Sequence, residues 1–213
     1  MVGITFGDYH SYDDLNMILN SKTIDAPAPK TESVDIPGSD GVLDLTEFFG
    51  GVNYENRTLT FNFSIVDSPS NFMAAFSTIQ NAIHGKKMNI VLDDDANFYY
   101  VGRVTVDKWK ADKTIGSVTV TADCDPYKYK KTETTVTQAI TGTGTVSLTN
   151  LRKPVAPRIS TDAAITIAWT GGSASLSAGN DQLVEELILK QGTTEVTVTG
   201  TANVTFKYRE GGL

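Results

Sequence analysis

The sequence predicts a mainly β protein of two domains: an N-terminal β-sandwich or meander with one packed α-helix, then a C-terminal β-sandwich. Three observations support this fold class. Apolar and polar residues alternate strictly in RTLTFNFSI, residues 57–65, as they do in a strand with one buried face. Between residues 69 and 84, apolar residues instead recur at spacings of three and four, which favours an amphipathic helix. Beyond residue 130 the chain is rich in Thr, Ser, Gly and Val, with glycine-containing turns every 8–12 residues or so, as in a sandwich or jelly roll.

A tight reversal is expected between residues 31 and 45. Pro37 fixes the backbone where the turn begins, and Gly38 and Gly41 permit conformations that other residues resist. The flanking segments TESVDI and GVLDL are therefore expected to be antiparallel arms.

The strand that follows has two chemically distinct faces. Its sheet is expected to cover a core on one side only. The apolar face consists of Leu59, Phe61, Phe63 and Ile65, and the polar face of Thr58, Thr60, Asn62 and Ser64.

One helix is predicted at about residues 69–84. Ser68 suits the N-cap, Pro69 the first helical position and Gly85 the C-terminal stop. His84 is expected in the last turn, where a cationic side chain meets the negative end of the helix dipole. Each large side chain of the apolar stripe would contribute about 1.5–3 kcal/mol when buried against a sheet. The stripe consists of Phe72, Phe76, Ile79 and Ile83.

A β-meander is expected after the helix. Cys124 ends its last strand and is expected to be a small packed residue. The expected elements are a strand in MNIVL (88–92), a turn in DDDAN (93–97), a strand in FYYVGRVTVDKW (98–109), a turn in ADKT (111–114) and a strand in IGSVTVTADC (115–124).

The boundary between the domains is expected near residues 127–133, because Pro126 ends the strand pattern. In VEELILK, residues 184–190, strong β neighbours favour a strand over a helix. Trp169 has the parity of Ile165 and Ile167, so we expect it to be buried rather than to offer a flat surface to a sugar.

Composition excludes several functional classes. The formal net charge of −7 argues against a sequence-specific nucleic-acid binder, which needs clustered Lys and Arg. A single cysteine excludes an internal disulfide. The N-terminus has no secretory-signal pattern, and no apolar run of about 18 residues predicts a membrane span. We expect a soluble protein without membrane contact.

Candidate chemistry is weak. Asp93, Asp94 and Asp95 could bind a hard cation, but EF-hand spacing is missing, so a solvated hairpin turn is favoured. A hydrolytic triad would need His10 or His84 as base, and neither lies in a known catalytic motif. Glycoside cleavage needs two carboxylates that are paired in space, and nothing in the sequence singles out such a pair. We predict no catalytic residue, no cofactor and no metal.

Several segments occur in a fixed order along the chain: ITFGDYHSYDDLNM, VDIPGSDGVLDLTEFFG, YENRTLTFNF, IHGKKMNIVLDDDANFYYVGR, CDPYKYKK and FKYREGGL. In this order they closely resemble the distal tail proteins, the Dit family of long-tailed (siphovirus-type) bacteriophages and prophages of Gram-positive bacteria. The resemblance covers nearly the whole chain and is strongest over residues 31–130. Ala96 and Asn97 depart from it, because the family often has proline after the acidic residues.

The resemblance implies a structural, non-enzymatic protein of the phage tail tip or baseplate. Residues 1–130 would form a hexameric ring, single or stacked, and residues 131–213 a galectin-like domain. The implied partners are the tail tube protein, a tail-associated tail-tip protein and a receptor-binding protein. The chain would be made in the host bacterial cytoplasm and reside at the virion tail tip. DNA would pass through the ring, and an acidic chain suits a lumen that does not retain it.

A ring would let neighbouring copies complete one another's open sheet edges. We expect the segment from Val34 to Arg57 to form this interface, although maintenance of a turn within the monomer is an equal alternative. The alternative function is a carbohydrate-binding module for host cell-wall polysaccharide, and a glycan hydrolase is a distant third. The candidate interface residues are Pro37, Gly38, Asp40, Gly41, Asp44, Tyr54 and Arg57.

Overall fold

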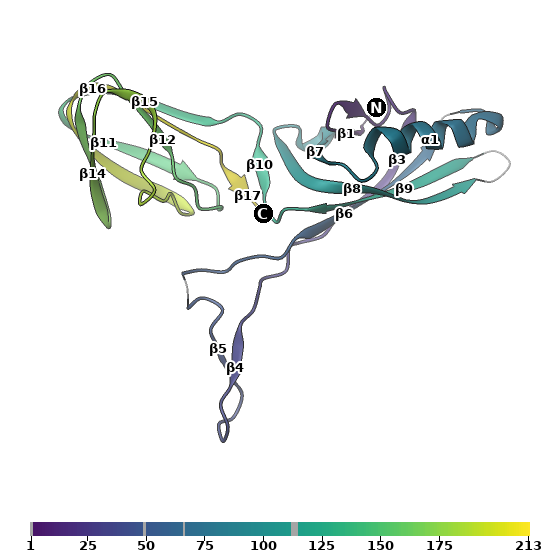
Figure 1. The fold of residues 1–213 in the computed structure, drawn as a ribbon, viewed down its shortest axis with the longest axis horizontal. Helices are drawn as coiled ribbons and strands as arrows, with labels where there is room; N and C mark the ends of the chain where they lie inside the picture. Colours follow the sequence, from purple (N-terminus) through teal and green to yellow (C-terminus); the bar gives the residue numbers. More distant parts are fainter. Residues whose placement is uncertain (1, 49, 66, 112–114) are drawn as a thin grey trace. The chain divides into compact units, whose positions relative to one another are not determined.

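A computed structural model of the chain describes residues 2–48, 50–65, 67–111 and 115–213. Its contacts divide the chain into two compact units, unit 1 (Met1–Pro126) and unit 2 (Tyr127–Leu213). Strands dominate both units and unit 1 contains the expected helix, which confirms the predicted fold class (Figure 1). Residues 127–130, which we assigned from the sequence to the first domain, lie in unit 2, because strand β10 pairs with the C-terminal strand β17.

The sheet of unit 1 runs in the order β2-β1-β7-β8-β9-β6-β3, and its pairings are antiparallel. β6 lies between β9 and β3, and β7, β8 and β9 form the expected meander. The strands are β1 (Ile4–Phe6), β2 (Tyr9–His10), β3 (Met17–Ile24), β6 (Arg57–Ile65), β7 (Lys87–Leu92), β8 (Phe98–Ala111) and β9 (Gly116–Cys124).

The alternation along β6 builds the core of unit 1 as predicted. Phe61 and Phe63 are fully buried, whereas Thr58 on the other face is exposed. The sheet curls so that its two ends face each other across this core. The Phe6 ring of β1 lies 5.7 Å from that of Phe61, although β7, β8 and β9 separate their strands in the sheet.

The predicted helix is present, with a different start. Pro69–Asn71 form a 3-10 turn, and the α-helix α1 is Phe72–Ile83. The Ser68 side chain does not cap it, because its hydroxyl lies 3.0 Å from that of Ser70 instead. Gly85 ends the helix with a positive φ of 74°, as expected. The apolar stripe packs on the core; within it, Phe76 stacks on Trp109, with the ring centroids 4.9 Å apart.

His84 corrects our expectation for the last helical turn. It follows the helix as its C-cap residue, in an extended conformation. Its Nδ1 accepts a hydrogen bond of 3.0 Å from the backbone N–H of Val106. The ring thus links the end of α1 to β8.

The acidic segment between β7 and β8 forms a short 3-10 turn, Asp93–Asp95. The turn predicted in ADKT lies mostly outside the described residues. Cys124 ends β9 and is fully buried, and this burial is the main cause that raises the pKa of its thiol to about 12. A thiol held protonated in this way is a poor nucleophile.

Unit 2 is built on a long antiparallel ribbon of β11 and β16, which pair over their full lengths. The other edge of β16 pairs with β13 near its start and with β12 near its end. The strands are β10 (Lys128–Lys130), β11 (Thr134–Asn150), β12 (Arg158–Thr161), β13 (Ile165–Trp169), β14 (Gly172–Leu176), β15 (Gly179–Leu183), β16 (Gly192–Tyr208) and β17 (Gly211–Gly212).

A glycine pair lies in the middle of this ribbon. Gly142 and Gly200 are opposite each other in the register and have φ of 78° and 140°, a region that side chains disfavour. The partner strand changes from β13 to β12 on either side of this pair, while one core joins both halves. The two halves of the ribbon thus enclose a single core, as in a sandwich.

Two expectations for unit 2 need correction. VEELILK is not a strand: a turn hydrogen bond joins Leu187 N to Val184 O, and an isolated bridge pairs Leu189 with Val155. Leu187 and Leu189 are both fully buried, although neither belongs to a strand. Trp169 is only partly buried, because it lies at the end of β13 and packs at the margin of the core.

Candidate assembly interface

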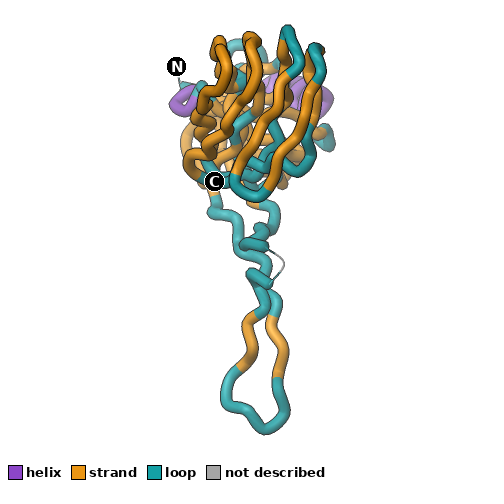
Figure 2. Tube along the Cα trace, turned by 90° about the vertical axis from the view of Figure 1, so that its left-hand side faces the viewer, coloured by secondary structure: helices purple, strands orange, loops and turns teal. Residues whose placement is uncertain are grey.

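A long hairpin, residues 25–56, leaves the sheet of unit 1 between β3 and β6; we call it the arm. Figure 2 shows it as a narrow double strand that extends away from the sheet. Asp25 N–H donates to Thr58 O at its base, and Lys30 and Glu55 make backbone hydrogen bonds across it. The expected antiparallel pairing is present near the tip, where β4 (Ser33–Asp35) pairs with β5 (Val42–Asp44).

The tip of the arm is the turn expected from its Pro-Gly and Asp-Gly steps. Ser39 N–H donates to Ile36 O at 3.1 Å, and Gly38 and Gly41 both have positive φ. Neither glycine has an atom within 4 Å of the position a Cβ would occupy. Their role is thus conformational, and the protomer itself leaves the space around them open.

The arm exposes apolar side chains on both of its faces. Val34 and Leu43 are opposite each other in the register and are 45% and 48% exposed. Val42, which is 60% exposed, is opposite Asp35 at the next position and so points to the other face. Ile36 and Phe48 are exposed as well. A short two-stranded ribbon is marginally stable in water, and a cluster of exposed apolar residues marks an interaction surface.

The arm is also strongly acidic. It contains seven carboxylates and a single cationic side chain, Lys30, so most of the net charge of −7 lies in this segment. Hydrogen bonds from Thr46, including its N–H to Asp44 Oδ1 at 2.9 Å, lower the pKa of Asp44. The carboxylates are those of Asp25, Glu32, Asp35, Asp40, Asp44, Glu47 and Glu55.

The structure brings six of the seven candidate interface residues together on the arm. Pro37, Gly38, Asp40 and Gly41 form its exposed tip, and Asp44 ends β5. Tyr54 is half-buried near the base, in an isolated bridge with Pro29. The exposed apolar residues of β4 and β5 belong to the same surface, although we singled out only turn residues and polar residues. Their signal in the sequence was valine and leucine flanking a turn.

Arg57 differs from the other six. It is only 6% exposed and starts β6 on the core face, with its guanidinium 5.6 Å from the centroid of the Tyr100 ring. This geometry stabilises a buried cation through the aromatic face. Arg57 therefore acts within unit 1, in line with the alternative of a role inside the monomer.

The acidic turn after β7 is not simply a solvated turn, as we favoured. Asp93 Oδ2 accepts a hydrogen bond of 2.7 Å from Gly3 N–H and lies 3.2 Å from His10 Nε2. Asp94 forms an ion pair with Lys22 of β3. A hydrogen bond from Lys22 is the main cause that lowers the pKa of Asp94. The two carboxylates thus tie this turn to β2 and β3.

The remaining chemical candidates take structural positions. His10 lies between two carboxylates, with Nδ1 2.8 Å from Asp13 Oδ2 and Nε2 facing Asp93. The neighbouring Ser11 is fully buried, and its hydroxyl accepts the N–H of Ile4. Within the described ranges, no group of three or more His, Cys, Asp or Glu side chains is arranged to hold a metal ion. Nor does any helix in that part of the chain have the length and apolarity to cross a membrane.

Comparison with solved structures supports the resemblance seen in the sequence. The fold is shared with the crystal structure of SPP1 Dit (gp 19.1), described as a paradigm of the hub adsorption apparatus in phages that infect Gram-positive bacteria. The two structures align with a TM-score of 0.74 at 14% sequence identity, and the alignment covers 98% of this chain and 99% of SPP1 Dit. No protein-family model and no curated protein sequence matches this chain.

Proposed function

We propose that this protein is a structural hub of a phage tail tip, in which copies of unit 1 form a hexameric ring. The ring joins the tail tube to tail-tip and receptor-binding proteins, and DNA passes through it. The protein has no catalytic role and resides in the virion after synthesis in the host cytoplasm. This proposal is supported by the fold shared with SPP1 Dit over nearly the whole chain.

The main structural support for a ring is the exposed apolar surface of the arm. Its β4–β5 ribbon exposes Val34, Val42 and Leu43 on two faces, and nothing in the described part of unit 1 covers them. A neighbouring copy in a closed rotation would cover all arms equally, whereas a monomer would leave every arm in water. The acidic arm would then face a surface of the neighbour that carries fewer carboxylates.

Negative-stain images of the purified chain test the assembly. Rings are the expected result, with a measured mass in solution of six chains. Monomers at all concentrations would contradict self-assembly of the chain alone, and addition of a tail tube protein would then show whether a partner nucleates the ring.

The alternative function, a carbohydrate-binding module in unit 2, is tested on the same sample. Retention on a column of host cell-wall polysaccharide by a protein that stays monomeric would favour it. The shallow cleft of unit 2 is lined by residues such as Thr166, Ser175 and Thr199, without an aromatic platform among its described lining residues, so we favour the hub.

A further inference from the structure

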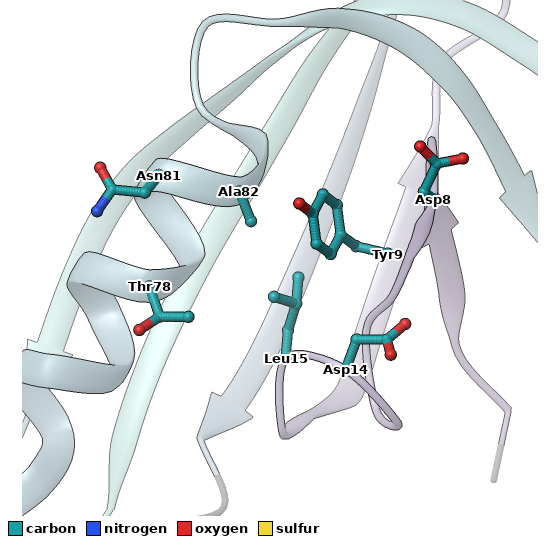
Figure 3. A pocket seen from close by; sticks show the side chains of 7 residues that line it. All are labelled: Asp8, Tyr9, Asp14, Leu15, Thr78, Asn81 and Ala82. Carbon is teal, nitrogen blue, oxygen red and sulfur yellow. The ribbon is translucent and has the colours of Figure 1, made fainter.

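A groove runs along one flank of α1 in unit 1, away from the arm in sequence. It consists of two adjoining cavities of about 540 and 250 Å³, which share Asp14, Leu15 and Thr78 as lining residues. Figure 3 shows the larger one, with the helix side chains of Thr78 and Ala82 on one wall and Asp8 and Asp14 on the other.

Small side chains keep this flank of the helix open. Ala74, Ala75, Thr78 and Ala82 line the two cavities at spacings of one to four residues. The apolar stripe of α1 packs on the core instead, and the exposed Met73 lines neither cavity, so no large apolar side chain of the helix fills the groove.

The opposite wall is already fixed in the protomer. Asn16 N–H donates to Tyr12 O at 3.2 Å and Met17 N–H to Ser11 O at 2.7 Å, which closes the turn between β2 and β3. Leu15 is only 5% exposed and anchors this turn in the core. A groove with preformed walls binds without the entropic cost of ordering a loop.

The charge of the groove has one sign. Among the described residues that line either cavity, the charged ones are Asp8, Asp14 and Asp67. Asp14 Oδ2 accepts the N–H of His10, and Asp67 Oδ1 accepts the N–H of Ser68, so one oxygen of each is engaged within the protomer. The three carboxylates create a negative potential that favours a cationic ligand group.

An aromatic ring lies beside these carboxylates. Tyr9 is 41% exposed, and Figure 3 shows its ring between the helix wall and the two aspartates. The aliphatic stem of a lysine or arginine can pack on such a ring while its charged end reaches a carboxylate.

We propose that this groove binds an extended segment of a partner tail protein through a lysine or arginine that packs on Tyr9 and pairs with Asp8 and Asp14. The arm of a neighbouring copy is a poor occupant, because its seven carboxylates would face those of the groove. This proposal depends on the proposed function in one respect: the proposed function is the reason to expect that the partner is a tail protein.

A labelled peptide of sequence Gly-Leu-Arg-Leu-Gly, titrated with the full chain and followed by fluorescence anisotropy, tests this site. We expect it to bind at least tenfold more tightly than Gly-Leu-Glu-Leu-Gly at low ionic strength, and more weakly as salt rises. Asp8→Asn should weaken binding of the arginine peptide about threefold. Thr78→Trp, which fills the position that both cavities share, should weaken it tenfold or more.

Ser77→Trp is the matched control. Ser77 and Thr78 are adjacent, exposed, and each donates a hydroxyl hydrogen bond to the carbonyl four residues earlier, but only Thr78 lines the groove. Equal binding of the two peptides, no binding of the arginine peptide, or equal effects of the two tryptophans would overturn the proposal. Mass in solution, measured on the same samples, reports ring assembly separately, so failure of the groove and failure of the hub can be told apart.

Discussion

The arm and β6 are consecutive in the chain and contain similar apolar residues, yet their burial is opposite. In β6, Phe61 and Phe63 are fully buried, whereas Val42 and Leu43 of the arm are 60% and 48% exposed. β6 has β9 and β3 on its two sides and faces β1 across a core, while β5 pairs with β4 alone. Both segments thus form strands, but only the apolar side chains of β6 are covered by other parts of the protomer. The difference supports the proposal that another chain supplies a surface that covers the arm.

Among the substitutions that test this difference, Phe61→Ala should cause the largest loss in the free energy of unfolding of unit 1. Removal of a fully buried ring costs about 3–5 kcal/mol of the free energy of unfolding, because the transfer term and the cavity term add. Urea unfolding of unit 1, followed by Trp109 fluorescence in a Trp169→Phe background, measures the loss. A change below about 1 kcal/mol would contradict the core position of β6.

Glu210→Gln should destabilise unit 2 by about 1.5–3 kcal/mol at neutral pH. Burial of Glu210 alone would raise its pKa, but hydrogen bonds from Thr134 and Lys130 outweigh burial and lower it. A lowered folded pKa stabilises the fold above the ordinary glutamate pKa of 4.5, and this contribution is lost as pH falls through the folded value. The difference between wild type and variant in urea, followed by Trp169 fluorescence in a Trp109→Phe background, should therefore shrink as pH falls below about 4.5. A difference that stays constant with pH would refute this role.

Gly102→Ala should cost unit 1 about 1–3 kcal/mol through overpacking. A Cβ at Gly102 would lie 2.7 Å from the carbonyl oxygen of Asp123, on the strand that pairs with it. Backbone at that position cannot move aside without disturbing the β8–β9 ladder. Thermal unfolding gives the measurement, with Gly38→Ala as the contrasting variant whose cost is conformational strain at a positive φ.

Leu43→Ser should have the smallest effect on the protomer, below about 0.5 kcal/mol. Its side chain is already exposed, so little apolar area returns to water when it is shortened. Urea unfolding at a concentration below that of ring formation is the appropriate measurement. A loss comparable to that of Phe61→Ala would mean that the arm folds back on its own protomer.

Local pattern predicted the elements whose partners are close in sequence or repeat at a fixed period. The alternation of β6, the apolar stripe of α1 and the turn at Gly38 and Gly41 all follow from such patterns. Arg57 shows where this approach failed: we listed it as a candidate interface residue, but its parity along β6 places it on the core face beside Tyr100. Asp94 shows another limit, since its partner Lys22 is distant in sequence and meets it only because the sheet curls.

The sequence predicted the candidate interface only as a segment, without the residues that are exposed in it. Resemblance to the distal tail proteins directed attention to residues 34–57, and the turn glycines were visible there. The exposure of Val34, Val42 and Leu43 could not be predicted, because a valine or leucine in a strand is usually buried. Burial depends on whether the rest of the protomer supplies a covering surface, which a local pattern does not encode.

We propose above all that a neighbouring copy covers the apolar residues of the arm. Multi-angle light scattering of Leu43→Asp tests it most directly, with Thr31→Asp as the control that adds the same charge to an exposed arm position outside β4 and β5. We expect six-chain rings for wild type and Thr31→Asp, and folded monomers for Leu43→Asp. Rings of unchanged mass and stability in Leu43→Asp would contradict the account.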